Sequence, residues 1–158
     1  MKNKISVILI CLGFILTTSC SKDEDPTPPA ETAEQLLTKS AWKIDELRWN
    51  QVNTSGGGSA YYYKRGTTGN ISNLDNESVL FTTSGTGTYT LGNVSSPLAW
   101  QFNNSEKTKI TFIITYAVGS PLTVYWENMV LSSTTLRYSE YFTTSAGINS
   151  LASGTRTH

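Results

Sequence analysis

From residue 42 onward, apolar and polar residues alternate in short runs that are separated by turn-forming residues. A period of two places the apolar side chains on one face of a β-strand. The clearest run covers 109–116, where Ile110, Phe112 and Ile114 fall on the same face. The pattern predicts eight strands, at 42–49, 60–64, 78–83, 86–91, 98–103, 108–116, 122–131 and 134–142.

Short links between consecutive strands indicate antiparallel hairpins, and such a sheet hides its edges by closing. We therefore predict an all-β fold, an up-and-down barrel of about eight strands. In the first strand the apolar phase changes between Ile44 and Leu47, which predicts a β-bulge at Asp45 and Glu46. Ahead of the barrel, Thr32 can cap one short helix over 33–39.

Residues 1–19 have the pattern of a signal peptide, with two early lysines and then an apolar stretch over 5–16. The run Leu16-Thr17-Thr18-Ser19-Cys20 resembles the lipobox of bacterial lipoproteins, so we expect acyl chains on Cys20 and an outer-membrane or cell-surface location. The alternative is a plain secreted protein cut near Ser19. Residues 20–31, acidic and rich in proline, predict a tether; the barrel domain is expected over 32–142 and a flexible tail over 143–158.

The landmarks of the barrel follow an order that is found in a known group. Val79-Leu80-Phe81 precedes Gly87-Thr88-Tyr89-Thr90, Trp100-Gln101-Phe102 leads to Ile110-Thr111-Phe112, and a tight hairpin spans 131–136. This order resembles the lipocalin-like lipoproteins of the Bacteroidota. The resemblance implies a small antiparallel barrel and no established catalytic activity.

Composition and charge narrow the chemistry. The 12 basic and 12 acidic residues cancel and are scattered, so a nucleic-acid partner is not expected. The only histidine is His158, which leaves no interior imidazole for a Ser-His-Asp triad or a histidine-ligated metal. We predict no catalytic residues, no metal and no cofactor, and hence a protein that is not an enzyme.

Candidate ligand-binding residues lie on the inward phases of the strands. If Glu140 keeps the phase of Leu136 and Tyr138, it points inward and is the one polar candidate for a ligand contact. The alternative, which the pattern favours, is a solvated carboxylate at the rim. The aromatic side chains either line a pocket for a small apolar ligand or fill the barrel completely. They are Trp42, Phe81, Tyr89, Trp100, Phe102, Phe112 and Tyr138.

A second candidate site is the strand of Tyr61, Tyr62 and Tyr63, which is followed by two basic residues and lies in the Gly/Ser/Asn-rich segment 50–77. Exposed tyrosines can stack on sugar rings or contact a protein. The expected function is therefore non-catalytic binding of a small apolar ligand by a membrane-anchored lipoprotein. The alternative is a solid-core interaction module that meets a protein or glycan through 61–65 and the 50–77 loop.

Overall fold

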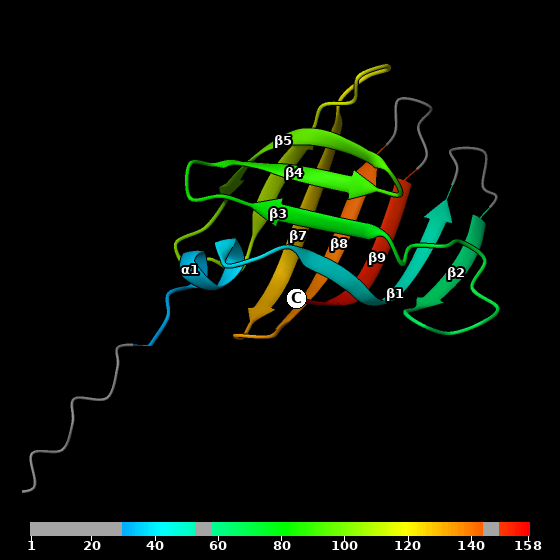
Figure 1. Cartoon of the computed structure of the whole chain (residues 1–158), viewed down its shortest axis with the longest axis horizontal. Helices are drawn as coiled ribbons and strands as arrows, with labels where there is room; N and C mark the ends of the chain where they lie inside the picture. The colour runs from blue at the N-terminus through cyan, green and yellow to red at the C-terminus, as the bar shows by residue number, and fades with distance from the viewer. Residues whose placement is uncertain (1–29, 53–57, 144–148) are drawn as a thin grey trace, which may run out of the picture. The chain divides into compact units, whose positions relative to one another are not determined.

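The computed structural model describes residues 30–52, 58–143 and 149–158. Cys20, the predicted signal peptide and nearly all of the predicted tether lie outside the described residues. The described chain forms one helix and nine strands (Figure 1). These are α1 (Ala33–Thr38), β1 (Trp42–Val52), β2 (Gly58–Lys64), β3 (Glu77–Phe81), β4 (Thr86–Leu91), β5 (Val94–Phe102), β6 (Ile110–Ile114), β7 (Leu122–Leu131), β8 (Thr135–Thr143) and β9 (Asn149–Thr157).

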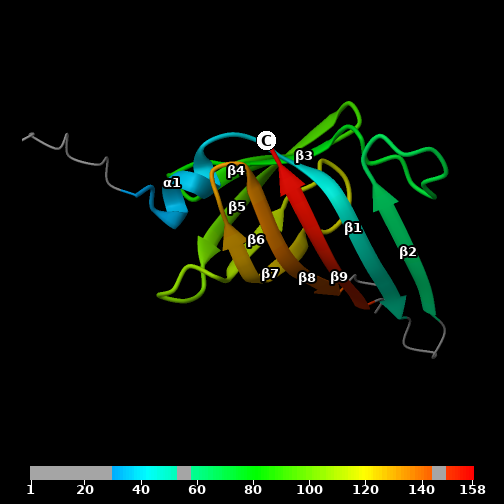
Figure 2. The same ribbon diagram turned by 90° about the horizontal axis from the view of Figure 1, so that it is seen from below.

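The strands form one antiparallel sheet that closes on itself, because β9 pairs with β8 on one side and with β1 on the other. β1 has two different neighbours on its remaining edge. Trp42 and Lys43 pair with β3, whereas 46–52 pair with β2. The barrel therefore consists of β1 and β3–β9, and β2 lies outside it (Figure 2). The predicted eight-stranded antiparallel barrel is confirmed.

Two strands occupy positions in the sheet that differ from the sequence-based expectation. The predicted strand at 60–64 exists as β2, but it flanks the barrel instead of belonging to its wall. The eighth barrel strand is β9, so the predicted flexible tail is wrong for 149–157. The inward positions of β9 include Ser150, Ala152, Gly154 and Arg156, which give no apolar alternation. Backbone pairing with two neighbours overrides this weak propensity.

Two β-bulges set which side chains face the interior. The register of β1 shifts between Ile44 and Glu46, as predicted, so that Ile44 and Leu47 are both buried. A second shift lies in β7 between Glu127 and Val130, where Asn128 has a φ of 53°. This bulge explains why the sequence pattern of 122–131 has no single phase.

The helix α1 covers one end of the barrel. A capping box starts it: the Thr32 hydroxyl accepts a hydrogen bond from the Gln35 backbone N–H, and the Gln35 side chain accepts one from the Thr32 N–H. Leu37 is fully buried, and its carbonyl oxygen accepts a 2.9 Å hydrogen bond from the Trp42 indole. We call this end, where β1 begins, the helix end. The opposite end, where β1 finishes, is the open end.

Candidate ligand-binding site

The helix end of the barrel is packed solid by aromatic rings. Phe81 contacts Trp100, Phe112 and Trp126 edge-to-face, with ring centroids 5.4–5.7 Å apart. The Trp100 indole N–H donates to the Thr82 carbonyl oxygen at 3.0 Å, which satisfies its polar atom. Edge-to-face packing of this kind stabilises the fold beyond the contribution from the area that each ring buries. The cluster leaves no room for a ligand, and it forms a floor for the space above it.

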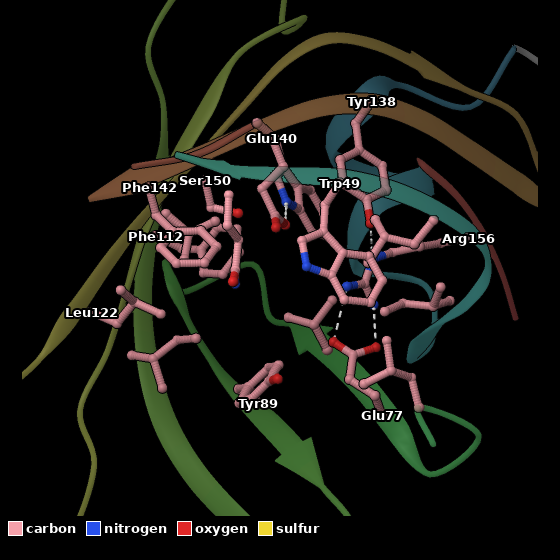
Figure 3. Close-up of a pocket in the computed structure, with 18 of the residues that line it drawn as sticks. Trp49, Glu77, Tyr89, Phe112, Leu122, Tyr138, Glu140, Phe142, Ser150 and Arg156 are labelled. Carbon is pink, nitrogen blue, oxygen red and sulfur yellow. Dashed lines mark hydrogen bonds and ion pairs between the residues drawn. The ribbon is translucent and has the colours of Figure 1, made fainter. Parts of the chain in front are cut away.

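A cavity of about 190 Å³ lies between this floor and the open end (Figure 3). Phe112, Ile114 and Val124 are buried on its inner side, whereas Leu122 and Phe142 are half-buried nearer to the open end. The cavity opens to solvent beside these half-buried residues. Aromatic side chains make up much of the wall: Trp49, Tyr89, Phe112, Tyr116, Trp126, Tyr138 and Phe142.

A buried ion pair crosses the interior at one side of the cavity. The two terminal nitrogens of Arg156 donate to the two carboxylate oxygens of Glu77 at 2.7 and 2.9 Å, and both side chains are almost completely buried. Arg156 also donates to the Trp42 carbonyl oxygen and to the Tyr138 hydroxyl. Burial by itself lowers the pKa of Arg156, but Glu77, Tyr138 and Glu140 raise it, and the net direction is upward. The two parallel N–H···O bonds are the geometry of a guanidinium–carboxylate ion pair, in which the two charges cancel locally.

A glycine makes room for the Tyr138 hydroxyl beside this pair. A Cβ atom on Gly154 would lie 3.0 Å from that hydroxyl oxygen and 3.0 Å from Leu47 Cδ1, which is tighter than most real contacts, so one of these neighbours would have to move. Burial raises the pKa of Tyr138. Tyr138 therefore stays protonated at neutral pH, with its ring facing the cavity.

Glu140 is the second carboxyl group of the interior. Its Oε2 accepts a 2.6 Å hydrogen bond from the Trp126 indole N–H, a partner that lies directly across the β7–β8 pairing. The side chain is half-buried and lines the cavity, and Figure 3 shows it on the side opposite Tyr89. Burial raises the pKa of Glu140, while Arg156 and the Trp126 hydrogen bond lower it, and the net direction is upward.

The eight predicted lining residues separate into two groups. Tyr89, Phe112, Tyr138 and Glu140 line the cavity. The other four belong to the filled helix end and do not line it: Trp42, Phe81, Trp100 and Phe102. The prediction for these four as ligand contacts is wrong, because α1 and the stacked rings take up the space at that end.

The three tyrosines of β2 do not form a common surface. Tyr61 stacks on Trp49, with ring centroids 4.9 Å apart, and Tyr62 is exposed beside the Arg48 guanidinium. Tyr63 is completely buried, and its hydroxyl donates to Asp75 at 2.6 Å. Burial and this bond raise the pKa of Tyr63 to about 12. Tyr63 is thus a packing residue, and its predicted place on a partner-binding surface is wrong.

Several site residues were missed from the sequence. Trp126 lies on the strand whose phase the β7 bulge obscured. Glu77 is the first residue of β3 and follows a polar loop, so the sequence pattern assigns it to that loop. Arg156 lies in a Ser/Thr/Gly-rich segment that gives no strand pattern. The available signal for Arg156 was its spacing of two and four residues from Gly154 and Ala152, which puts all three on one face of a strand.

No family model, no curated protein and no solved structure matches the chain. Across the ranges that the structure describes, no group of three His, Cys, Asp or Glu side chains is placed to hold a metal ion. None of the helices in those ranges has the length and apolar character needed to span a membrane.

Proposed function

We propose that the barrel binds a small, mainly apolar ligand without chemical conversion. The observation that carries this proposal is the contrast inside one barrel, filled at the helix end and hollow behind Phe112 and Trp126. Aromatic walls and a few convergent polar groups are the usual composition of ligand pockets.

The size of the cavity limits the ligand. Pockets for drug-sized molecules measure roughly 300–1,000 Å³, and the cavity here measures about 190 Å³. An engineered apolar cavity of about 150 Å³ already accommodates benzene. The proposed ligand therefore has about one six-membered ring and a short substituent.

The polar groups of the interior support binding over catalysis. Among the described residues, Glu77 and Glu140 are the carboxyl groups that line the cavity, and Glu77 is held by Arg156 through two hydrogen bonds, so that only Glu140 is without a cation partner. Hydrolysis by paired carboxyl groups needs two acids that converge on one substrate bond. A lone carboxyl group beside aromatic rings serves to orient a ligand.

The test of this proposal is a titration of the isotope-labelled protein with benzyl alcohol, followed by NMR. Binding in the cavity shifts the methyl resonances of Ile114, Val124 and Leu122, which line it. The methyl groups of Leu136, buried outside the cavity, serve as the internal reference. Saturable shifts that are confined to the lining support the proposal. Shifts confined to the outer surface, or no saturable shift, contradict it.

The predicted alternative of a solid-core interaction module has less support. It requires a completely filled barrel, whereas filling extends only over the helix end. It also relied on three adjacent tyrosines, of which one is buried in the protein interior.

We further propose that the chain is anchored to a membrane by acyl chains on Cys20, outside the described residues. Support comes from the apolar stretch 5–16 and the lipobox-like run that follows it. Cys20→Ala is expected to release the protein from the membrane fraction. Cys11→Ala, in the apolar stretch, is the matched control and keeps it there. If the Cys20 variant stays in the membrane fraction, the anchor is wrong.

A further inference from the structure

The charges around the cavity do not balance. Among the described residues that line it, the charged side chains are Glu77, Glu140 and Arg156. Arg156 gives both of its terminal nitrogens to Glu77, and the two side chains are at most 4% exposed. This pair is neutral as a unit, and Arg156 also donates to the Trp42 carbonyl oxygen and the Tyr138 hydroxyl. An ionised Glu140 then leaves one negative charge without a counter-ion in the interior.

Among the described residues, the surroundings of Glu140 offer it a hydrogen-bond donor but no cation besides Arg156. From β7, Trp126 donates one hydrogen bond to Oε2, and within the described chain no donor reaches Oε1. Arg156 of β9 acts on Glu140 through space and Glu77 of β3 opposes it. The phenols of Tyr138 and Tyr89 complete the set of titratable groups that act on it. The Glu140 side chain thus lines the cavity with Oε1 left to accept a hydrogen bond from a ligand.

The aromatic rings of the wall provide an independent preference for positive charge. The face of each ring is the negative side of its quadrupole, and a cation over that face is attracted. The protein already uses this interaction in its interior, where the Arg156 guanidinium lies 5.0 Å from the Trp126 ring centroid and 5.5 Å from that of Tyr138. Aromatic rings combined with a carboxylate are the chemistry that recognises organic ammonium groups.

We propose that the ligand class is small organic amines, bound as ammonium ions, with the nitrogen donating to Glu140 and the hydrocarbon part packed between Phe112, Trp49 and Tyr89. This inference rests on the proposed ligand-binding function and specifies the chemical class of the ligand. A carboxylate ligand would meet two carboxyl groups and an arginine that is already paired. A neutral ligand would fill the same space but leave the Glu140 charge uncompensated.

Four probes of one shape test this inference: benzylamine, benzyl alcohol, toluene and benzoate, titrated by calorimetry or NMR at pH 7.5 and low salt. Benzylamine is expected to bind roughly tenfold or more tightly than benzyl alcohol, with benzoate weakest. Glu140→Gln keeps the shape and the acceptor for Trp126 but removes the charge. In this variant the two affinities are expected to converge. Glu127→Gln, which removes an outward carboxyl group from β7 beside Lys109, is the matched control and keeps the preference.

A measurement on the unmodified chain removes any dependence on how the variant folds. Between pH 7.5 and pH 4.5, protonation of Glu140 should weaken benzylamine binding while benzyl alcohol binding stays constant. The same decline for both probes would overturn the inference.

The outcomes distinguish failure of the amine assignment from failure of the proposed ligand-binding function. If benzyl alcohol and benzylamine bind equally well, or benzoate binds most tightly, the amine assignment is wrong and the binding function stands. If none of the four probes binds in the cavity, the proposed function itself is wrong. An amine preference that survives in Glu140→Gln places the recognition elsewhere and also overturns the inference.

Discussion

The two ends of the barrel are built from the same alternation of inward aromatic residues, yet one is solid and the other hollow. At the helix end, Phe81 meets Trp100 and Trp126 edge-to-face, and the fully buried Leu37 of α1 belongs to the same core cluster. Beyond Lys43, β1 pairs with β2 in place of β3, and towards the open end the inward residues of β9 are small, namely Ser150, Ala152 and Gly154. The space inside a small barrel therefore depends on the size of the side chain opposite each ring and not on the number of rings.

The largest effect is expected from breaking the ion pair that spans the interior. Arg156→Leu leaves Glu77 buried and unpaired, which should destabilise the protein by about 3–5 kcal/mol. Replacing both residues with leucine should recover most of that loss, because two apolar side chains need no partner. Urea unfolding of the single and double variants measures this. A double variant that is no more stable than Arg156→Leu would contradict the account.

The next largest effect is the loss of stability when an aromatic ring is removed, compared between the helix end and the open end. Phe81→Ala should cost about 3–5 kcal/mol, because it opens a void in a fully packed cluster. Phe142→Ala at the open end should cost less than about 2 kcal/mol, since its side chain is already half-buried beside the cavity. Thermal and urea unfolding give both values. Equal costs would mean that the two ends are packed alike.

A smaller effect comes from adding volume instead of removing it. Ile110 and Ile114 lie on the same face of β6, but only Ile114 lines the cavity. Ile110→Phe should destabilise by about 1–3 kcal/mol through overpacking. Ile114→Phe should cost less than about 1 kcal/mol, since empty space is beside it, and should abolish benzyl alcohol binding. If Ile114→Phe is as costly as Ile110→Phe, the cavity is not empty space.

The smallest effect is the pH dependence of Glu140. Burial raises its pKa above the unfolded value, so the folded protein binds more protons between the two pKa values. This contribution to stability is complete below the unfolded pKa and is lost as the pH rises through the folded pKa. Glu140→Gln, which cannot ionise, should therefore unfold at a higher temperature than the parent protein at pH 8. The difference should shrink towards pH 4, whereas a difference that grows on acidification contradicts the raised pKa.

The sequence predicts the barrel and the inward position of Glu140 because both follow from a period of two in β6 and β8. It does not predict that β9 completes the wall, since Ser150, Ala152 and Gly154 carry no apolar signal. The interior ion pair is hidden for a related reason. Glu77 and Arg156 are 79 residues apart in the chain, and they meet only because β9 and β3 both adjoin β1.

The most direct test of the hollow half-barrel is a crystal structure of the protein grown or soaked with benzyl alcohol. The account predicts electron density for the ring above Phe112 and Trp126, on the side of Tyr89, with the hydroxyl group within hydrogen-bonding distance of Glu140. A barrel whose interior is filled by its own side chains, with benzyl alcohol found only on the outer surface, would contradict it.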